Sequence, residues 1–174
     1  MFYLIAIFLT AGITITADLL TKYFTDGLHM EIIPNVLSFV SAHNSGAGWS
    51  FLEGEAWAMV LFIVLAIIAS IGIIVFELFF NNKFKNAVYG LGVGLLVGGI
   101  VGNLVDRIAM GEVRDFIHFD FMQFPIFNLA DMALTFGVIL IAIYMLFLYE
   151  RKKKQFGKEE RFFVSLKKRF VKKG

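Results

Sequence analysis

The chain has 174 residues, of which 59% are hydrophobic and only 17% are charged. Soluble globular chains have roughly half apolar and a quarter charged residues, so this composition excludes an ordinary soluble domain. There is no cysteine. That absence excludes disulfides, thiolate nucleophiles and thiol-ligated metals.

Apolar residues occur in blocks long enough to cross a bilayer, which takes about 20 residues of helix. Backbone polar groups must be satisfied within their own segment in hydrocarbon, so these blocks are predicted to be helices. The first block lacks a basic leading region and a clear cleavage site, so we expect a retained helix rather than a removed signal sequence. The prediction is an all-α membrane protein with four transmembrane helices, at about residues 2–20, 57–76, 87–105 and 126–148.

Polar residues at the ends of these blocks follow in chain order. Asp18 and Lys22 are four residues apart on the first helix, the favourable order for an ion pair. The loop after it has strand-like alternation at 34–41 and small residues at 43–50. The second block is apolar all round except Ser70, so lipid can cover most of it.

The third block has glycines at four-residue spacing, at Gly90, Gly94, Gly98 and Gly102. This stripe predicts close approach of another helix, either within the chain or in a homodimer. It leads to Asn103, Asp106 and Arg107, and a tight seam that ends in polar residues is typical of a scaffold for a site.

The second outer loop holds Asp115 among five phenylalanines, which favours a position near the membrane interface. Pro125 suits the first turn of the fourth helix, which would place Asp131 about two turns inside the membrane. Asn128, Asp131 and Thr135 share one face of that helix. Polar faces normally point into a bundle, so we expect three helices to meet at one polar site.

Basic residues predict the orientation. Of 16 Lys and Arg, Lys83 and Lys85 lie between the second and third blocks and eleven lie in the tail from 151 to 173. Both termini are therefore expected in the cytoplasm, with outer loops at about 23–56 and 106–125. Residues 1–150 form the predicted membrane domain. The basic tail, 151–174, is expected either to lie on anionic lipid or to be a solvated anchor, and nucleic acid is not an expected partner.

Asp115 and Asp131 are the candidate catalytic pair. Two close carboxylates share a proton, so the ionised member can activate water while the protonated member polarises a carbonyl and later donates to the leaving amine. This chemistry needs no metal and no cofactor. His29, His43 and His118 are scattered, which argues against a metalloprotease. A small proton-coupled carrier or lipid-binding scaffold is the alternative, although internal repeats typical of many transporters are absent.

Five motifs follow one another along the chain: Asp18-Leu19-Leu20-Thr21-Lys22, Asn44-Ser45-Gly46-Ala47-Gly48-Trp49-Ser50, Gly98 to Arg107, Gly111 to Phe116, and Phe127-Asn128-Leu129-Ala130-Asp131. Taken together, from the first helix through the fourth, they resemble the motif set of the lipoprotein signal peptidase (signal peptidase II) family.

This resemblance implies an aspartic endopeptidase of the bacterial inner membrane. It would remove signal peptides from diacylglyceryl-modified prolipoproteins just before the lipidated cysteine. Four helices with a small extracytoplasmic β-rich cradle, sensitivity to globomycin, contact with membrane lipids and a monomeric state are also expected. Asp115 and Asp131 match the catalytic pair, and the matched supporting positions are Asp18, Lys22, Asn44, Gly46, Asn103, Asp106, Arg107, Asn128 and Ala130.

The chain departs from the family pattern at Leu19, Gly48, Trp49, Arg114 and His118. Arg114 stands where an apolar residue usually precedes the first catalytic aspartate. A cation favours the ionised form of a nearby carboxyl group. We therefore predict that Asp115 is the more acidic partner unless Arg114 points away to solvent.

Overall fold

The computed structural model describes residues 2–46, 56–81, 86–148 and 151. Within this part of the chain there are four apolar helices long enough to cross a membrane and one three-stranded sheet, which confirms the predicted combination. Residues 47–50 of the small-residue loop and the tail from 152 onward lie outside the described residues. The helices are α1 (Phe2–Thr25), α2 (Ala56–Val75) with a π-helical turn η2 (Phe76–Phe80), α3 (Ala87–Met110) and a fourth helix, Leu129–Leu148.

The helix ends nearest the sheet differ from the prediction. Helix α1 continues to Thr25 and α3 to Met110, because their charged residues pair with one another inside the bundle instead of ending the helices. The fourth helix begins later than predicted, at Leu129. Phe127 forms a β-bridge with Ile117, so the backbone before the helix is extended. The prediction that Pro125 lies in the first helical turn is therefore wrong.

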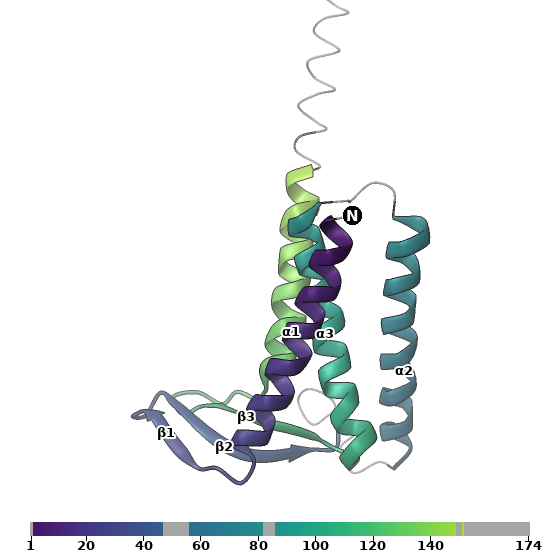
Figure 1. The fold of residues 1–174 in the computed structure, drawn as a ribbon. Helices are drawn as coiled ribbons and strands as arrows, with labels where there is room; N and C mark the ends of the chain where they lie inside the picture. The colour runs from purple at the N-terminus through teal and green to yellow at the C-terminus, as the bar shows by residue number, and fades with distance from the viewer. Residues whose placement is uncertain (1, 47–55, 82–85, 149–150, 152–174) are drawn as a thin grey trace, which may run out of the picture.

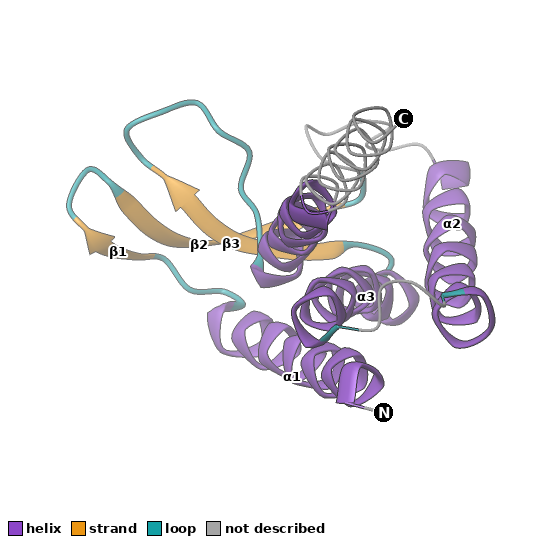
Figure 2. Ribbon diagram, turned by 90° about the horizontal axis from the view of Figure 1, so that it is seen from above, coloured by secondary structure: helices purple, strands orange, loops and turns teal. Residues whose placement is uncertain are grey.

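Helix α3 is the centre of the bundle and packs against α1 and the fourth helix (Figure 2). A methyl group added at Gly90 would lie 2.6 Å from the Tyr3 carbonyl oxygen, and one at Gly98 would lie 2.7 Å from Thr14 Cβ. The predicted glycine stripe thus brings α3 against α1 of the same chain. On another face, a methyl group at Gly99 would lie 2.5 Å from the Ala130 carbonyl oxygen of the fourth helix.

Helix α2 lies on the side of the bundle away from the sheet (Figure 1). No residue of its most apolar stretch is buried, so this apolar surface is open to lipid, as the sequence predicts. At the end far from the sheet, Glu77 accepts hydrogen bonds from the Tyr89 hydroxyl (2.9 Å) and Asn81 Nδ2 (2.6 Å). Near the other end, the Arg107 guanidinium lies 5.4 Å from the Phe62 ring centroid. Helix α2 is therefore attached by a few specific contacts.

The sheet projects sideways from one end of the bundle, whereas the start of α1 and the end of the fourth helix lie at the other end (Figure 1). Its strands are β1 (Met30–Ile33), β2 (Leu37–Asn44) and β3 (Val113–Phe119), antiparallel in the order β1-β2-β3. Strand β2 begins later than the predicted alternation and extends to Asn44. Because Ala42 pairs with Asp115, the sheet places a candidate catalytic residue at a fixed register.

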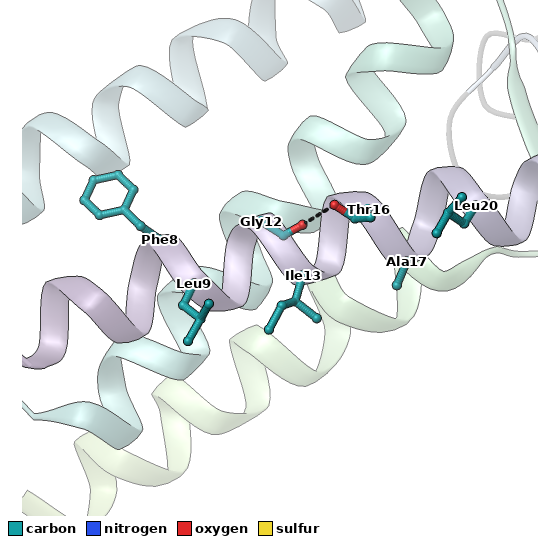
Figure 3. Close-up of a pocket in the computed structure, with 7 residues that line it drawn as sticks. All are labelled: Phe8, Leu9, Gly12, Ile13, Thr16, Ala17 and Leu20. Carbon is teal, nitrogen blue, oxygen red and sulfur yellow. Dashed lines mark hydrogen bonds between the residues drawn. The ribbon is translucent and has the colours of Figure 1, made fainter.

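The outward side of α1 carries a shallow apolar groove, shown in Figure 3. Thr16 Oγ1 donates a hydrogen bond of 2.8 Å to the Gly12 carbonyl oxygen, so the hydroxyl group on this face is paired. None of the predicted site residues lines the groove. Its lining residues are Phe8, Leu9, Gly12, Ile13, Thr16, Ala17 and Leu20.

Candidate active site

Asp131 lies in the first turn of the fourth helix, not two turns inside it. Asn128 precedes the helix, and its Oδ1 accepts a hydrogen bond of 3.0 Å from the Asp131 backbone N–H. In return, Asp131 Oδ2 accepts a hydrogen bond of 3.1 Å from the Asn128 backbone N–H. This reciprocal arrangement is a capping box, which satisfies backbone donors that a helix start leaves unpaired. It fixes the Asp131 carboxylate at the positive end of the helix dipole.

Asp18 on α1 holds the same helix start from another side. Its Oδ1 accepts a hydrogen bond of 2.8 Å from the Ala130 backbone N–H. Its Oδ2 lies 2.7 Å from Lys22 Nζ, and neither side chain is exposed. Gly102 permits this contact, because a methyl group there would lie 2.6 Å from Asp18 Oδ2. Ala130 therefore contributes to the site through its backbone N–H.

Asp115 reaches the site from β3. Its Oδ2 accepts a hydrogen bond of 3.1 Å from Asn44 Nδ2, and its Oδ1 accepts one of 2.6 Å from Asn128 Nδ2. Burial of the carboxyl group raises the pKa of Asp115 to about 6, with a further contribution from the negative charge of Asp131. These effects outweigh the two amide donors, which lower the pKa. Asp115 therefore holds a proton more readily than an exposed aspartate.

Asn128 connects the two acids. It is fully buried, its Nδ2 donates to Asp115, and its Oδ1 and backbone N–H bond to Asp131. Asn103 on α3 adds a second link, since its Nδ2 donates to Asp131 Oδ1 at 2.7 Å. Asn103 Oδ1 accepts hydrogen bonds from Lys22 Nζ (2.9 Å) and Asn128 Nδ2 (3.0 Å). The predicted polar faces of three helices therefore meet, and the sheet supplies the second carboxylate.

Arg107 ties α3 to the loop that follows β2. Its Nη2 donates a hydrogen bond of 3.0 Å to the Gly46 carbonyl oxygen, and its charge acts on both Asp115 and Asp131. Asn44 Oδ1 accepts a hydrogen bond of 2.9 Å from the Gly46 N–H, which orients the Asn44 amide toward Asp115. The Arg107 guanidinium and the turn from Asn44 to Gly46 therefore fix the position of Asn44 beside Asp115.

Two sequence-based expectations need correction. The Arg114 side chain does not reach Asp115 but donates to Asp106 at 2.7 Å through Nη2. The expectation that Arg114 lowers the pKa of Asp115 is therefore wrong, because the guanidinium pairs with Asp106 and the pKa of Asp115 is raised instead. Thr135 does not join the site either, since it is exposed and its Oγ1 donates to the Asp131 carbonyl oxygen at 2.9 Å.

The structure brings all eleven predicted site residues into one connected network. Asp106 joins through Lys22 Nζ at 3.4 Å, although it lies within α3 and not in the loop as predicted. Two features were missed that the sequence contains. Asn128-Leu129-Ala130-Asp131 has the spacing of a capping box, and strand alternation predicts that Arg114 and Asp115 face opposite sides. Within the described residues, no group of three or more His, Cys, Asp or Glu side chains could hold a metal ion.

Relatives of this chain are signal peptidases. The family model described as signal peptidase (SPase) II matches residues 10–147. A lipoprotein signal peptidase from Lactobacillus johnsonii is 41% identical over 143 residues, covering 80% of this chain and 90% of the relative. One from Enterococcus faecalis is 39% identical over 148 residues, covering 82% and 89%.

The fold has solved counterparts as well. A bacterial membrane enzyme solved at 2.3 Å resolution by the in meso method superposes with a TM-score of 0.70 at 38% identity, covering 79% of this chain and 85% of that chain. A second bacterial membrane enzyme structure, at 1.9 Å, gives a TM-score of 0.68 at 38% identity, covering 79% and 90%. The family match, the relatives and the membrane fold agree, and the chain belongs to the signal peptidase II family, whose members are aspartic proteases that process lipoproteins.

Proposed function

We propose that this protein removes the signal peptide from diacylglyceryl-modified prolipoproteins, cleaving just before the lipidated cysteine, with Asp115 and Asp131 activating the water. The observation that carries the mechanism is the single buried amide of Asn128, which lies between the two acids and bonds to both residues. The raised pKa of Asp115, about 6, supports an unequal pair in which Asp115 holds the shared proton.

We assign the roles of the two acids from the raised pKa of Asp115. Asp131, ionised, takes a proton from water as the water oxygen attacks the scissile carbonyl carbon. Asp115 donates a hydrogen bond from its proton to the carbonyl oxygen, where negative charge develops. Collapse of the tetrahedral intermediate breaks the C–N bond, and the leaving amine takes a proton from the acid pair. The pair then again holds one proton, so the cycle closes without a metal or a cofactor.

We place the site at the outer face of a bacterial inner membrane, with both termini in the cytoplasm. The concentration of Lys and Arg in the tail and between α2 and α3 supports this orientation. The start of α1 and the end of the fourth helix lie at the bundle end opposite the sheet (Figure 1), as such a topology requires. Outer-leaflet lipid and the acyl chains of the substrate would then surround the site, in a monomer that globomycin inhibits.

The test is cleavage of a purified diacylated prolipoprotein by the wild-type chain and by Asp115→Asn and Asp131→Asn in detergent. We expect each variant to lose at least about a hundredfold in kcat, because removal of general acid–base groups costs on the order of 10²–10⁴-fold. Asp120→Asn is the matched control. Asp120 also lies at the sheet, just after β3, but its carboxylate bonds to Ser38 and His118, away from the pair.

Full activity in either folded variant would contradict the two-aspartate mechanism, and an inactive wild type would contradict the proposed substrate. The unlipidated precursor tests the role of the lipid. We expect it to be cleaved more slowly, because acyl chains in the outer leaflet can position the scissile bond. Equal rates for both precursors would refute that role.

A further inference from the structure

Arg114 precedes Asp115 in β3 but faces the opposite side of the strand. Its Nη2 lies 2.7 Å from Asp106 Oδ1 and its Nε lies 3.3 Å from Asp106 Oδ2. The Arg114 backbone N–H also donates to Asp106 Oδ2, at 3.1 Å. One carboxylate on α3 thus accepts three hydrogen bonds from the residue next to Asp115. This contact fixes the beginning of β3 against the helix bundle.

Asp106 connects this contact to Asp131. Lys22 Nζ lies 3.4 Å from Asp106 Oδ2 and donates a hydrogen bond of 2.9 Å to Asn103 Oδ1. The Nδ2 of that same Asn103 amide donates to Asp131 at 2.7 Å. A continuous series of polar contacts therefore leads from Arg114, beside one acid, to the other acid.

The charges of the buried network balance. Asp18 and Asp106 contribute two negative charges, and Lys22 and Arg114 contribute two positive charges. Asp18, Lys22 and Asp106 are at most 1% exposed, so an uncompensated charge among them would be costly.

We propose that Arg114 is a positioning residue for the catalytic pair. By pairing with Asp106 it leaves Lys22 free to hold Asn103, and so sets the Asn103 amide against Asp131. By anchoring the backbone of β3 it also sets the side from which Asp115 enters the site. Arg114 acts only through these neighbours, and the inference rests on the proposed function.

Removing the Arg114 guanidinium changes the electrostatic attraction between Asp106 and Lys22. Among the described residues, the ion-pair partners of Asp106 are Lys22 and Arg114. In Arg114→Met, Asp106 attracts Lys22 alone, and closing the present 3.4 Å separation draws Nζ away from Asn103. The Asn103 amide then loses one of the contacts that orient it toward Asp131. Since Arg114 does not contact the site of bond cleavage, kcat should fall while KM stays nearly constant.

The experiment compares wild type, Arg114→Met, Arg114→Lys, Asp106→Asn and the double variant Asp106→Asn/Arg114→Met. We expect Arg114→Met to lose about tenfold in kcat, within the range of coupling in buried networks. The double variant should recover most of this loss. The amide oxygen that Asp106→Asn introduces can still accept the β3 N–H, and Asp18 and Lys22 then balance each other. Arg114→Lys, which keeps the charge, should lose less than Arg114→Met.

Wild-type kcat in folded Arg114→Met would overturn the proposal. So would a double variant that is no more active than expected from the product of the two single effects. Unfolding temperatures of the same proteins give a readout that does not need the substrate. If wild type fails to cleave, the proposed function fails. Non-additive changes in unfolding temperature would still support the Arg114–Asp106 coupling in that case, whereas additive changes would contradict it.

Discussion

Substitution of Gly102 by alanine tests how closely α1 and α3 must approach for the site to form. The added methyl group would lie 2.6 Å from Asp18 Oδ2 and 3.2 Å from Ala130 Cβ. Asp18 cannot simply rotate away. Its Oδ2 lies 2.7 Å from Lys22 Nζ and its Oδ1 accepts the Ala130 N–H at 2.8 Å.

The cost of Gly102→Ala can be worked from these contacts. If the helices separate to admit the methyl group, overpacking costs about 1–3 kcal/mol. If Asp18 moves instead, the site loses a hydrogen bond to a charged acceptor, which is worth about 1.5–3 kcal/mol. Either response gives a loss of about 2 kcal/mol in stability. Both responses also displace Ala130, which directly precedes Asp131, so we expect kcat to fall at least about tenfold.

Gly12→Ala is the matched control, because no atom lies within 4 Å of the position its methyl group would take. Gly12 lies in the outward groove of α1 (Figure 3). The assay measures unfolding temperature in detergent and kcat on the diacylated precursor for both variants. If Gly102→Ala behaves like Gly12→Ala in both measurements, the close approach of the helices at Gly102 does not support the site.

The kcat/KM of the free enzyme should fall as pH rises through about 6, because Asp115, with its raised pKa, loses the shared proton there. A profile that is flat from about pH 5 to 8 would contradict the assignment of the shared proton to Asp115. Asn128→Ala should lose about 0.5–2 kcal/mol of stability and most of the activity. Its control is Asn86→Ala, which removes the cap hydrogen bond to the Val88 N–H at the start of α3 and should lose stability only. If the two variants were equally active, Asn128 would make no catalytic contribution. Both ring nitrogens of His43 contact carboxylates, at 2.5 Å from Glu112 and 3.1 Å from Asp26, which requires an imidazolium, and the pKa of His43 is raised chiefly by Glu112. The stability this provides is present below the unfolded pKa of 6.5 and is lost as pH rises through the raised folded pKa, so unfolding temperature should fall in that window in wild type but not in His43→Gln.

Much of the bundle could be predicted because its signals are periodic. Continuous apolar blocks gave the number of helices, and the four-residue glycine spacing gave the contact face of α3. The polar residues at helical spacing on α1, α3 and the fourth helix correctly indicated one shared site. Sequence alone left open whether the stripe packs within the chain, because two copies of α3 could have used the same face.

The helix ends could not be predicted from hydropathy, because charged residues usually mark the end of an apolar block. Here Lys22 and Asp106 are buried and paired with each other, so α1 and α3 continue past the expected boundary. The position of Pro125 also misled the prediction. The backbone pairing of Phe127 with Ile117 holds that segment extended and moves the helix start to Leu129. Long-range pairing of this kind leaves no local signal.

The capping box links the start of the fourth helix to the chemistry of the site. Asn128 can orient Asp131 only when the helix begins at Leu129, since both reciprocal hydrogen bonds join the cap residue to the third helical residue. The remaining amide donors of Asn128 are aimed at Asp115 and Asn103. When the helix start forms, the capping box therefore fixes Asp131, and the Asn128 amide is oriented to donate to Asp115. The same Asn128 amide contacts Asn103, whose side chain links Lys22 to Asp131. A change that moves the helix start by one residue would break all of these contacts at once, even if it left Asp115 and Asp131 unchanged.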